Sequence, residues 1–243
     1  MQAQTVIPVL WNSKYYYSNG ERKVLYKPKH ASNYIFSVEA DNQRWFRDQL
    51  GATFTLSTPR LFTSLRVFDD IIDEANSDYP RGQACGLNIW KIIMEEVKVY
   101  LNICRPDWTI MLYTFTPPMP EGDQSLSGLG GMVGKENFGC SYARPGVSAD
   151  SGHKPFLACN YTAEQLISLG YSFPMWSAEW GAIAGGYAHE KVHCWTDLPH
   201  TENDPNTQVD ERYESILFAY WDYPNVGFLP NEAQALLESG ALS

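Results

Sequence analysis

Long apolar runs and an excess of basic charge are both missing from this sequence. No stretch approaches the ~20 consecutive apolar residues that a membrane-spanning helix needs. Lys and Arg number 18 against 28 Asp and Glu, which gives a formal net charge of −10. An acidic surface repels phosphate groups, so we expect neither a nucleic acid nor a membrane as a partner.

Cysteines are few and widely spaced, which excludes a zinc ribbon built on paired cysteines. The five are Cys85, Cys104, Cys140, Cys159 and Cys194. In an exported protein, Cys85 would pair with Cys104 and Cys140 with Cys159, leaving Cys194 free. In a reducing compartment all five would be buried thiols, and the sequence leaves both alternatives open.

The first residues also lack the basic and apolar regions of a signal peptide. The protein is then either intracellular or a mature form with an added methionine. We favour the mature form and therefore expect an extracellular or periplasmic location.

Neither internal repeats nor a linker interrupts the chain. A length of 243 residues suits one domain, and we expect a monomer. Within it we expect an N-terminal arm or hairpin over 1–36, with a turn at 18–20, and a C-terminal subdomain over 201–243.

Apolar periodicity predicts alternating helices and strands, and hence an α/β (α+β) fold. Residues 108–115 are almost continuously apolar, as expected of a strand buried on both faces. The other predicted elements are helices over 37–50, 87–101, 162–169 and 231–237, a strand over 52–56, and a strand followed by a helix over 61–75.

A glycine-rich segment spans residues 128–134. Val133 occupies the place of the last glycine of a nucleotide-binding loop and no helix follows, so we reject that function. A glycine-rich edge strand lets another backbone approach closely. We therefore predict that Gly130, Gly131 and Met132 bind a peptide substrate.

The most informative stretch contains three of the five histidines. His189 and His193 stand four residues apart, which on a helix places both imidazoles on one face. Glu190 completes the pattern His-Glu-x-x-His, in which two histidines bind zinc and the glutamate is the general base of a metalloprotease.

Surface histidines on an amphipathic helix would give the same spacing by chance. The neighbouring residues are apolar instead, which favours a buried helix: Ala182, Ala184, Ala188 and Val192. Unpartnered histidines on a buried helix would be costly, so the metal-site interpretation is the stronger one.

Taken together, these segments resemble the catalytic domain of the metzincin zinc peptidases, and more narrowly a group of bacterial metallopeptidases. The resemblance rests on residues 43–54, 128–134, 189–193, 198–200, 215–217, 223–225 and 229–230. It implies a zincin-like fold, with a mixed twisted sheet, a glycine-rich edge strand, a backing helix and the helix that carries the motif.

The resemblance also implies roles for single residues. His189, His193 and His200 become zinc ligands, Glu190 the general base, and a peptide or protein the substrate. Tyr220 and Tyr223 are candidates for binding the oxyanion, and we favour Tyr220.

The chain departs from the metzincin pattern at two points. His200 lies seven residues after His193 where the family has six, and Thr196 and Asp197 occupy the turn where the family has a glycine. Leu217 stands where the family has a methionine beneath the metal, and its similar volume predicts a similar floor.

The third ligand and the activity itself both have rivals. Asp197 is a further candidate by distance along the chain, and Glu211 or Glu214 would replace His200 in a site of the gluzincin type. A zincin-like binding or structural protein without turnover is the rival to the peptidase, because an activity depends on the geometry of a site.

Overall fold

The structure is a computed structural model. It describes residues 2–18, 20–24, 31–67, 70–71, 73–74, 85–102, 105–114, 138–140, 178–205 and 207–243. The predicted strand with Gly130, Gly131 and Met132 and the predicted helix over 162–169 lie outside these residues. Cys104 and Cys159 also lie outside them, so neither possible disulfide is tested, whereas Cys194 is a free, buried thiol.

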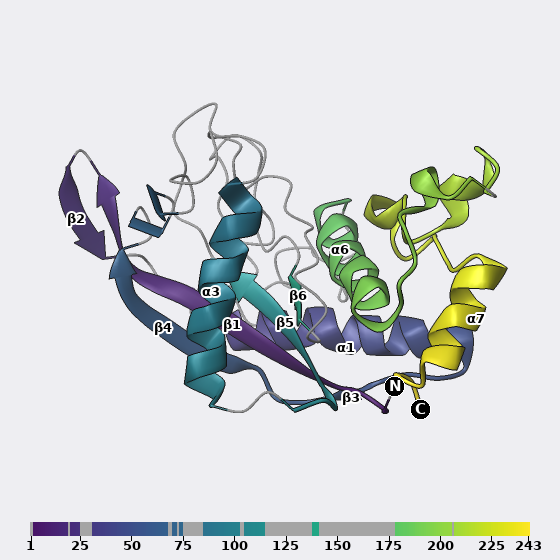
Figure 1. Cartoon of the computed structure of the whole chain (residues 1–243), viewed down its shortest axis with the longest axis horizontal. Helices are drawn as coiled ribbons and strands as arrows, with labels where there is room; N and C mark the ends of the chain where they lie inside the picture. Colours follow the sequence, from purple (N-terminus) through teal and green to yellow (C-terminus); the bar gives the residue numbers. More distant parts are fainter. Residues whose placement is uncertain are drawn as a thin grey trace, which may run out of the picture.

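The described part of the chain contains a six-stranded mixed sheet built around its first strand (Figure 1). The strands are β1 (Thr5–Ser18), β2 (Glu21–Val24), β3 (Thr55–Leu56), β4 (Arg60–Val67), β5 (Trp108–Thr114) and β6 (Phe138–Cys140). Strand β1 pairs in parallel with β3, β4 and β5, and β5 pairs in parallel with β6. Antiparallel pairing joins β1 to β2.

The N-terminal segment is partly what the sequence predicts. Its second half forms the expected hairpin, in which Ser18 pairs with Glu21 and Gly20 takes a φ of 76° that glycine adopts without strain. Its first half is the central strand of the sheet and not an arm. Two-sided burial explains this, since Val6 and Leu10 face one core while Ile7 and Val9 face the other.

Four α-helices of ten residues or more lie in the described ranges. They are α1 (Ala31–Leu50), α3 (Cys85–Leu101), α6 (Ala178–Trp195) and α7 (Pro230–Ser239). Helix α1 starts six residues earlier than the sequence predicts, and Gly51 ends it as expected, with a φ of 70°. Helix α3 buries Ile93, Val97 and Leu101 at four-residue steps, which confirms the predicted apolar face.

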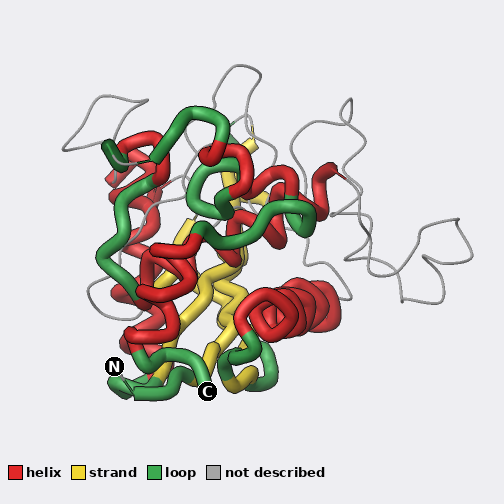
Figure 2. The backbone as a smooth tube through the Cα atoms, turned by 90° about the vertical axis from the view of Figure 1, so that its right-hand side faces the viewer, coloured by secondary structure: helices red, strands yellow, loops and turns green. Residues whose placement is uncertain are grey.

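The helices cover the sheet from both sides, so the strands lie in a middle layer (Figures 1 and 2). Helix α3 packs on one face, against a core that includes Trp11, Ile110 and Leu112. Helices α1 and α6 pack on the opposite face, where the core includes Met111 and Tyr113 of the same strand β5. This alternation confirms that β5 is buried on both faces.

A buried ion pair joins α6 to α1. The Lys191 Nζ atom lies 2.7 Å from Glu39 Oε2, and both side chains are fully buried. Lys191 also donates to Asn42 Oδ1 at 2.9 Å, and Tyr113 donates to Glu39 Oε1 at 2.6 Å. A shift of α6 along α1 would break this buried charge pair and its hydrogen bonds, which is costly. The pair therefore fixes the position of α6 against α1 and β5.

The C-terminal segment runs through the 3-10 helices η2 (Thr201–Asn203), η3 (Glu211–Glu214) and η4 (Tyr220–Asp222) before α7. Helix α6 packs closely against η4, and the tail ends beside the start of the sheet, where Gln4 N donates to Ala241 O at 2.9 Å. None of the helices in the described ranges combines the length and apolar character needed to cross a membrane.

Candidate metal centre

Helix α6 presents the whole His-Glu-x-x-His motif inside the protein. The side chains of His189, Glu190 and His193 are 6%, 2% and 7% exposed. Neighbouring Ala188 and Val192 are fully buried, so the helix is not the amphipathic surface helix of the chance interpretation. The sequence therefore predicts this element and its burial correctly.

A third histidine joins the first two from the loop after the helix. The Nε2 atom of His189 lies 3.1 Å from that of His193 and 3.3 Å from that of His200. The three ring centroids are 4.7, 5.0 and 4.8 Å apart, so the rings surround one point. These three histidines form a cluster that could hold a metal ion.

Backbone carbonyls orient two of the rings. His189 Nδ1 lies 2.9 Å from Ile216 O, and His193 Nδ1 lies 3.2 Å from Leu198 O. A carbonyl can only accept a hydrogen bond, so each Nδ1 carries the proton and each Nε2 presents a lone pair to the cluster. The Nδ1 atom of His200 lies 3.6 Å from Glu202 Oε1, which is too far for a hydrogen bond.

Burial keeps the two helical imidazoles neutral. It lowers the pKa of His189 to about 3, helped by repulsion from a charged His193, and it lowers the pKa of His193 to about 4. The hydrogen bonds to the two carbonyls oppose these shifts and do not reverse them. Both rings are therefore in the neutral form that binds metals.

Without a cation, the arrangement is electrostatically unfavourable. The lone pairs of His189 and His193 face each other at 3.1 Å with no proton between them. Two imidazoles bound to one tetrahedral zinc ion have their nitrogens about 3.3 Å apart, given a Zn–N bond of about 2.0–2.1 Å. The two separations from His189, 3.1 and 3.3 Å, match that value, and the three ligand atoms all lie within 4.8 Å of one another, so the cluster fits a divalent metal.

Glu190 is buried beside the cluster with a free acceptor. Its Oε2 atom has no hydrogen-bond partner within the described part of the chain. Burial raises the pKa of Glu190 to about 8, because water is not there to stabilise its charge. A buried, unpaired carboxylate is costly and is a common mark of a functional site.

The two candidate tyrosines occupy different environments. The ring of Tyr220 lies 5.4 Å from that of His189, and the residue is half-buried. Burial and the nearby charge of Glu190 raise its pKa, which keeps the hydroxyl protonated. Tyr223 is 3% exposed, with its hydroxyl 3.4 Å from Asn42 Nδ2. The structure therefore places Tyr220 at the histidine cluster and Tyr223 in the core.

The carboxylates considered as third ligands do not join the histidines. Glu211 and Glu214 are exposed in η3, where Glu211 Oε2 accepts a hydrogen bond from Gln208 N at 3.1 Å. Asp197 is exposed in the loop after α6. Leu217 is 1% exposed within the core that also includes Tyr187 and Ala188, as expected of an apolar floor.

Sequence patterns did not identify the groups that orient the histidines. The acceptors for His189 and His193 are main-chain atoms of Ile216 and Leu198, and any residue type offers such a carbonyl. The available sequence signal for a fixed loop is Pro199, directly before His200.

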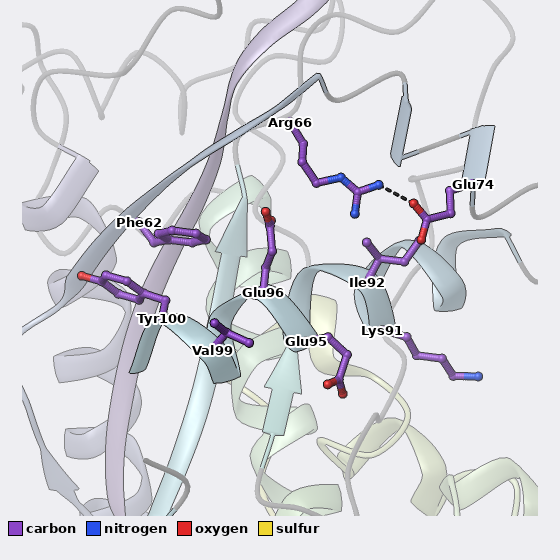
Figure 3. Close-up of a pocket in the computed structure, with 9 residues that line it drawn as sticks. All are labelled: Phe62, Arg66, Glu74, Lys91, Ile92, Glu95, Glu96, Val99 and Tyr100. Atoms are coloured by element: carbon purple, nitrogen blue, oxygen red, sulfur yellow. Dashed lines mark hydrogen bonds and ion pairs between the residues drawn. The ribbon is translucent and has the colours of Figure 1, made fainter. Parts of the chain in front are cut away.

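A separate groove lies between β4 and α3, on the face of the sheet opposite to α6 (Figure 3). It has a volume of about 560 Å³ and is lined partly by Phe62, Arg66 and Tyr100. Three of its polar side chains have partners, because Arg66 pairs with Glu74 and Glu96 accepts from Trp11 Nε1 at 2.7 Å. None of the sequence-predicted site residues that the structure describes lines it.

Comparison with known proteins identifies the fold and no family. No family model matches the chain, and no curated protein matches it. The structure is similar to that of wild-type OgpA from Akkermansia muciniphila, with a TM-score of 0.50 and 14% sequence identity. The likeness covers 97% of this chain and 60% of OgpA, so the chain spans less than two thirds of that protein. At this identity the shared property is the fold: a mixed α/β architecture with a largely parallel sheet.

Proposed function

We propose that this protein is a zinc-dependent endopeptidase with a zincin-like catalytic domain. The observation that carries the proposal is the meeting of three imidazole Nε2 atoms beside a buried, unpartnered carboxylate. Three converging imidazoles suit zinc, and a glutamate next to the first ligand suits a general base. His189, His193 and His200 are the proposed ligands.

Zinc bound there would supply Lewis acidity toward a water molecule and a peptide carbonyl. Glu190 takes the proton of the attacking water and later donates it to the leaving amine. Burial favours both steps, since a carboxyl group with a pKa near neutrality can accept and release a proton. A bound cation would lower that pKa and leave Glu190 ready to act as a base.

Substrate contacts complete the proposal. The hydroxyl of Tyr220, held protonated near His189 and Glu190, can donate a hydrogen bond to the oxyanion that forms from the peptide carbonyl. We propose that the peptide binds as an added strand along the segment with Gly130, Gly131 and Met132. We also propose that the protein is a monomer and that it acts in the periplasm or outside the cell.

Glu190→Gln tests the proposed function. The amide keeps the shape of the side chain and cannot accept the proton of water, so peptide cleavage should fall by about 10²- to 10⁴-fold. Zinc content, measured by elemental analysis, should stay at the wild-type value. Glu211→Gln is the matched control, because Glu211 is exposed and outside the cluster, and it should cleave as wild type does.

Two outcomes would contradict the proposal. Cleavage by Glu190→Gln at the wild-type rate would place the base elsewhere. A zinc-loaded wild-type protein that cleaves nothing in a broad peptide library would instead identify a metal-binding or structural protein that keeps this geometry without turnover.

A further inference from the structure

Three buried polar side chains form a hydrogen-bonded cluster that includes the residue directly after His200. Ser215 Oγ donates to Glu232 Oε1 at 2.6 Å, and Thr201 Oγ1 lies 3.2 Å from the same oxygen. The two hydroxyl oxygens are 2.8 Å apart. All three residues are at most 3% exposed, so water does not compete for these bonds. We call Thr201, Ser215 and Glu232 the anchor cluster.

The anchor cluster connects three separate segments of the chain. Thr201 directly follows His200 and begins η2. Ser215 directly precedes Ile216, whose carbonyl orients His189 at 2.9 Å, and its own Oγ accepts from Leu217 N at 3.0 Å. Glu232 lies in the first turn of α7. Glu232 Oε1 therefore links two loops. It binds Thr201, which follows His200, and Ser215, which precedes the residue whose carbonyl orients His189.

His200 needs such an anchor more than the other two histidines do. His189 and His193 are fixed by α6, which the Lys191–Glu39 pair holds against α1. His200 comes from a loop, and 43% of its side chain is exposed. Its ring position follows from its backbone, and the adjacent side chain of Thr201 is fully engaged with the anchor cluster.

Helix capping alone does not explain the burial of Glu232. Its Oε2 accepts from Leu229 N at 2.9 Å, which is an ordinary capping bond and would form equally well at the surface. The second oxygen, Oε1, accepts hydrogen bonds from the hydroxyls of Ser215 and Thr201, which lie in the loops around the histidines. Burying a carboxylate costs free energy that apolar packing would avoid, so its retention fits a role in fixing geometry.

We propose that the anchor cluster holds the His200 loop in the geometry that binds the metal, with Thr201, Ser215 and Glu232 as positioning residues. This inference rests on the proposed metal-dependent function, because it assigns the cluster a role at that same site. Such a role resembles that of the outer groups that orient metal ligands elsewhere in proteins, whose loss weakens metal binding by about 10- to 100-fold.

The test compares Thr201→Val with Thr201→Ser. Valine keeps the shape and removes the hydroxyl, whereas serine keeps the hydroxyl. Zinc affinity is measured by competition with a chelator of known affinity, and the visible spectrum of the cobalt-substituted protein reports ligand geometry. We expect Thr201→Val to bind zinc about tenfold more weakly and to show an altered cobalt spectrum. Thr201→Ser should stay within about twofold of wild type.

Leu236→Ala separates positioning from loss of stability. Leu236 is fully buried in α7 and is not part of the anchor cluster. This variant should melt at a lower temperature and bind zinc as wild type does. Wild-type affinity and spectrum in Thr201→Val would overturn the inference, as would an equal loss of affinity in Leu236→Ala. Both comparisons use metal binding, so they decide this inference even if the zinc-loaded protein cleaves no peptide.

Discussion

At the scale of single residues, Glu190 is the buried carboxyl group of the candidate metal centre. Burial raises its pKa from 4.5 to about 8, so between these values the folded protein holds a proton that the unfolded chain releases. The folded state then binds more protons than the unfolded state, and stability falls as the pH rises across this range. The two helical histidines act in the opposite direction, since their pKa values are lowered on folding.

Replacing Glu190 by glutamine should expose this effect. Measured without metal, the free energy of unfolding of Glu190→Gln minus that of wild type should be larger at pH 8 than at pH 5. The expected increase is on the order of a few kcal/mol. The histidines are present in both proteins, so their contributions cancel. A difference that is the same at both pH values would mean that the carboxyl is not buried in this way.

His200 distinguishes a site with three histidine ligands from a gluzincin-type site, in which a glutamate is the third ligand. We expect His200→Ala to lose zinc at least as severely as His193→Ala, because both remove one of three converging nitrogens. Glu211→Ala and Glu214→Ala should keep it, since both carboxylates are exposed and outside the cluster. Zinc content of the four purified variants checks this. Loss of metal in a glutamate variant would reassign the site to the gluzincin type.

At the scale of elements, the packing of α6 against η4 leaves no room for a side chain at Gly185. A Cβ atom there would lie 1.8 Å from Tyr220 O and 2.8 Å from Tyr223 Cβ. The first of these is a main-chain atom, which cannot rotate away. Helix α6 and the segment that carries Tyr220 therefore approach as closely as they do because residue 185 is glycine.

Gly185→Ala should accordingly destabilise the protein by about 3 kcal/mol, as overpacking of a core does. Denaturant unfolding measures the change. The direction of the change in unfolding free energy is informative, because alanine in place of glycine within a helix stabilises a protein by about 0.5–1 kcal/mol when space is available. A more stable variant would contradict the close approach of α6 and η4.

The elements that the sequence predicts well are those with a clear apolar pattern. Helix α3 has an apolar period, strand β5 is a continuous apolar run, and helix α6 combines the motif with apolar neighbours; the structure contains all three. The sequence predicts the hairpin that contains strand β1 but not the central place of this strand, because aromatic and β-branched residues indicate a strand without indicating its place in a sheet. That place depends on pairing with β4 and β5, which lie far along the chain.

At the scale of the whole molecule, the candidate metal centre is held by contacts distant in sequence. Glu39 of α1 pairs with Lys191 beside the motif, and Glu232 of α7 bonds to the neighbour of Ile216. Neither partner can be inferred from a motif, because each side chain is an ordinary acidic residue in the sequence. The clustering of His200 with the motif histidines is predictable, because a candidate metal site requires particular residue types at particular spacings.

The measurement that tests the account most directly is the metal content and zinc response of the wild-type protein. We predict about one zinc per chain on purification, and a clear rise in melting temperature when zinc is added back to metal-free protein. Binding to the folded state alone stabilises it by about 4 kcal/mol when free zinc is 1,000 times its Kd. Purified protein that carries no zinc and whose melting temperature is unmoved by added zinc would contradict the account.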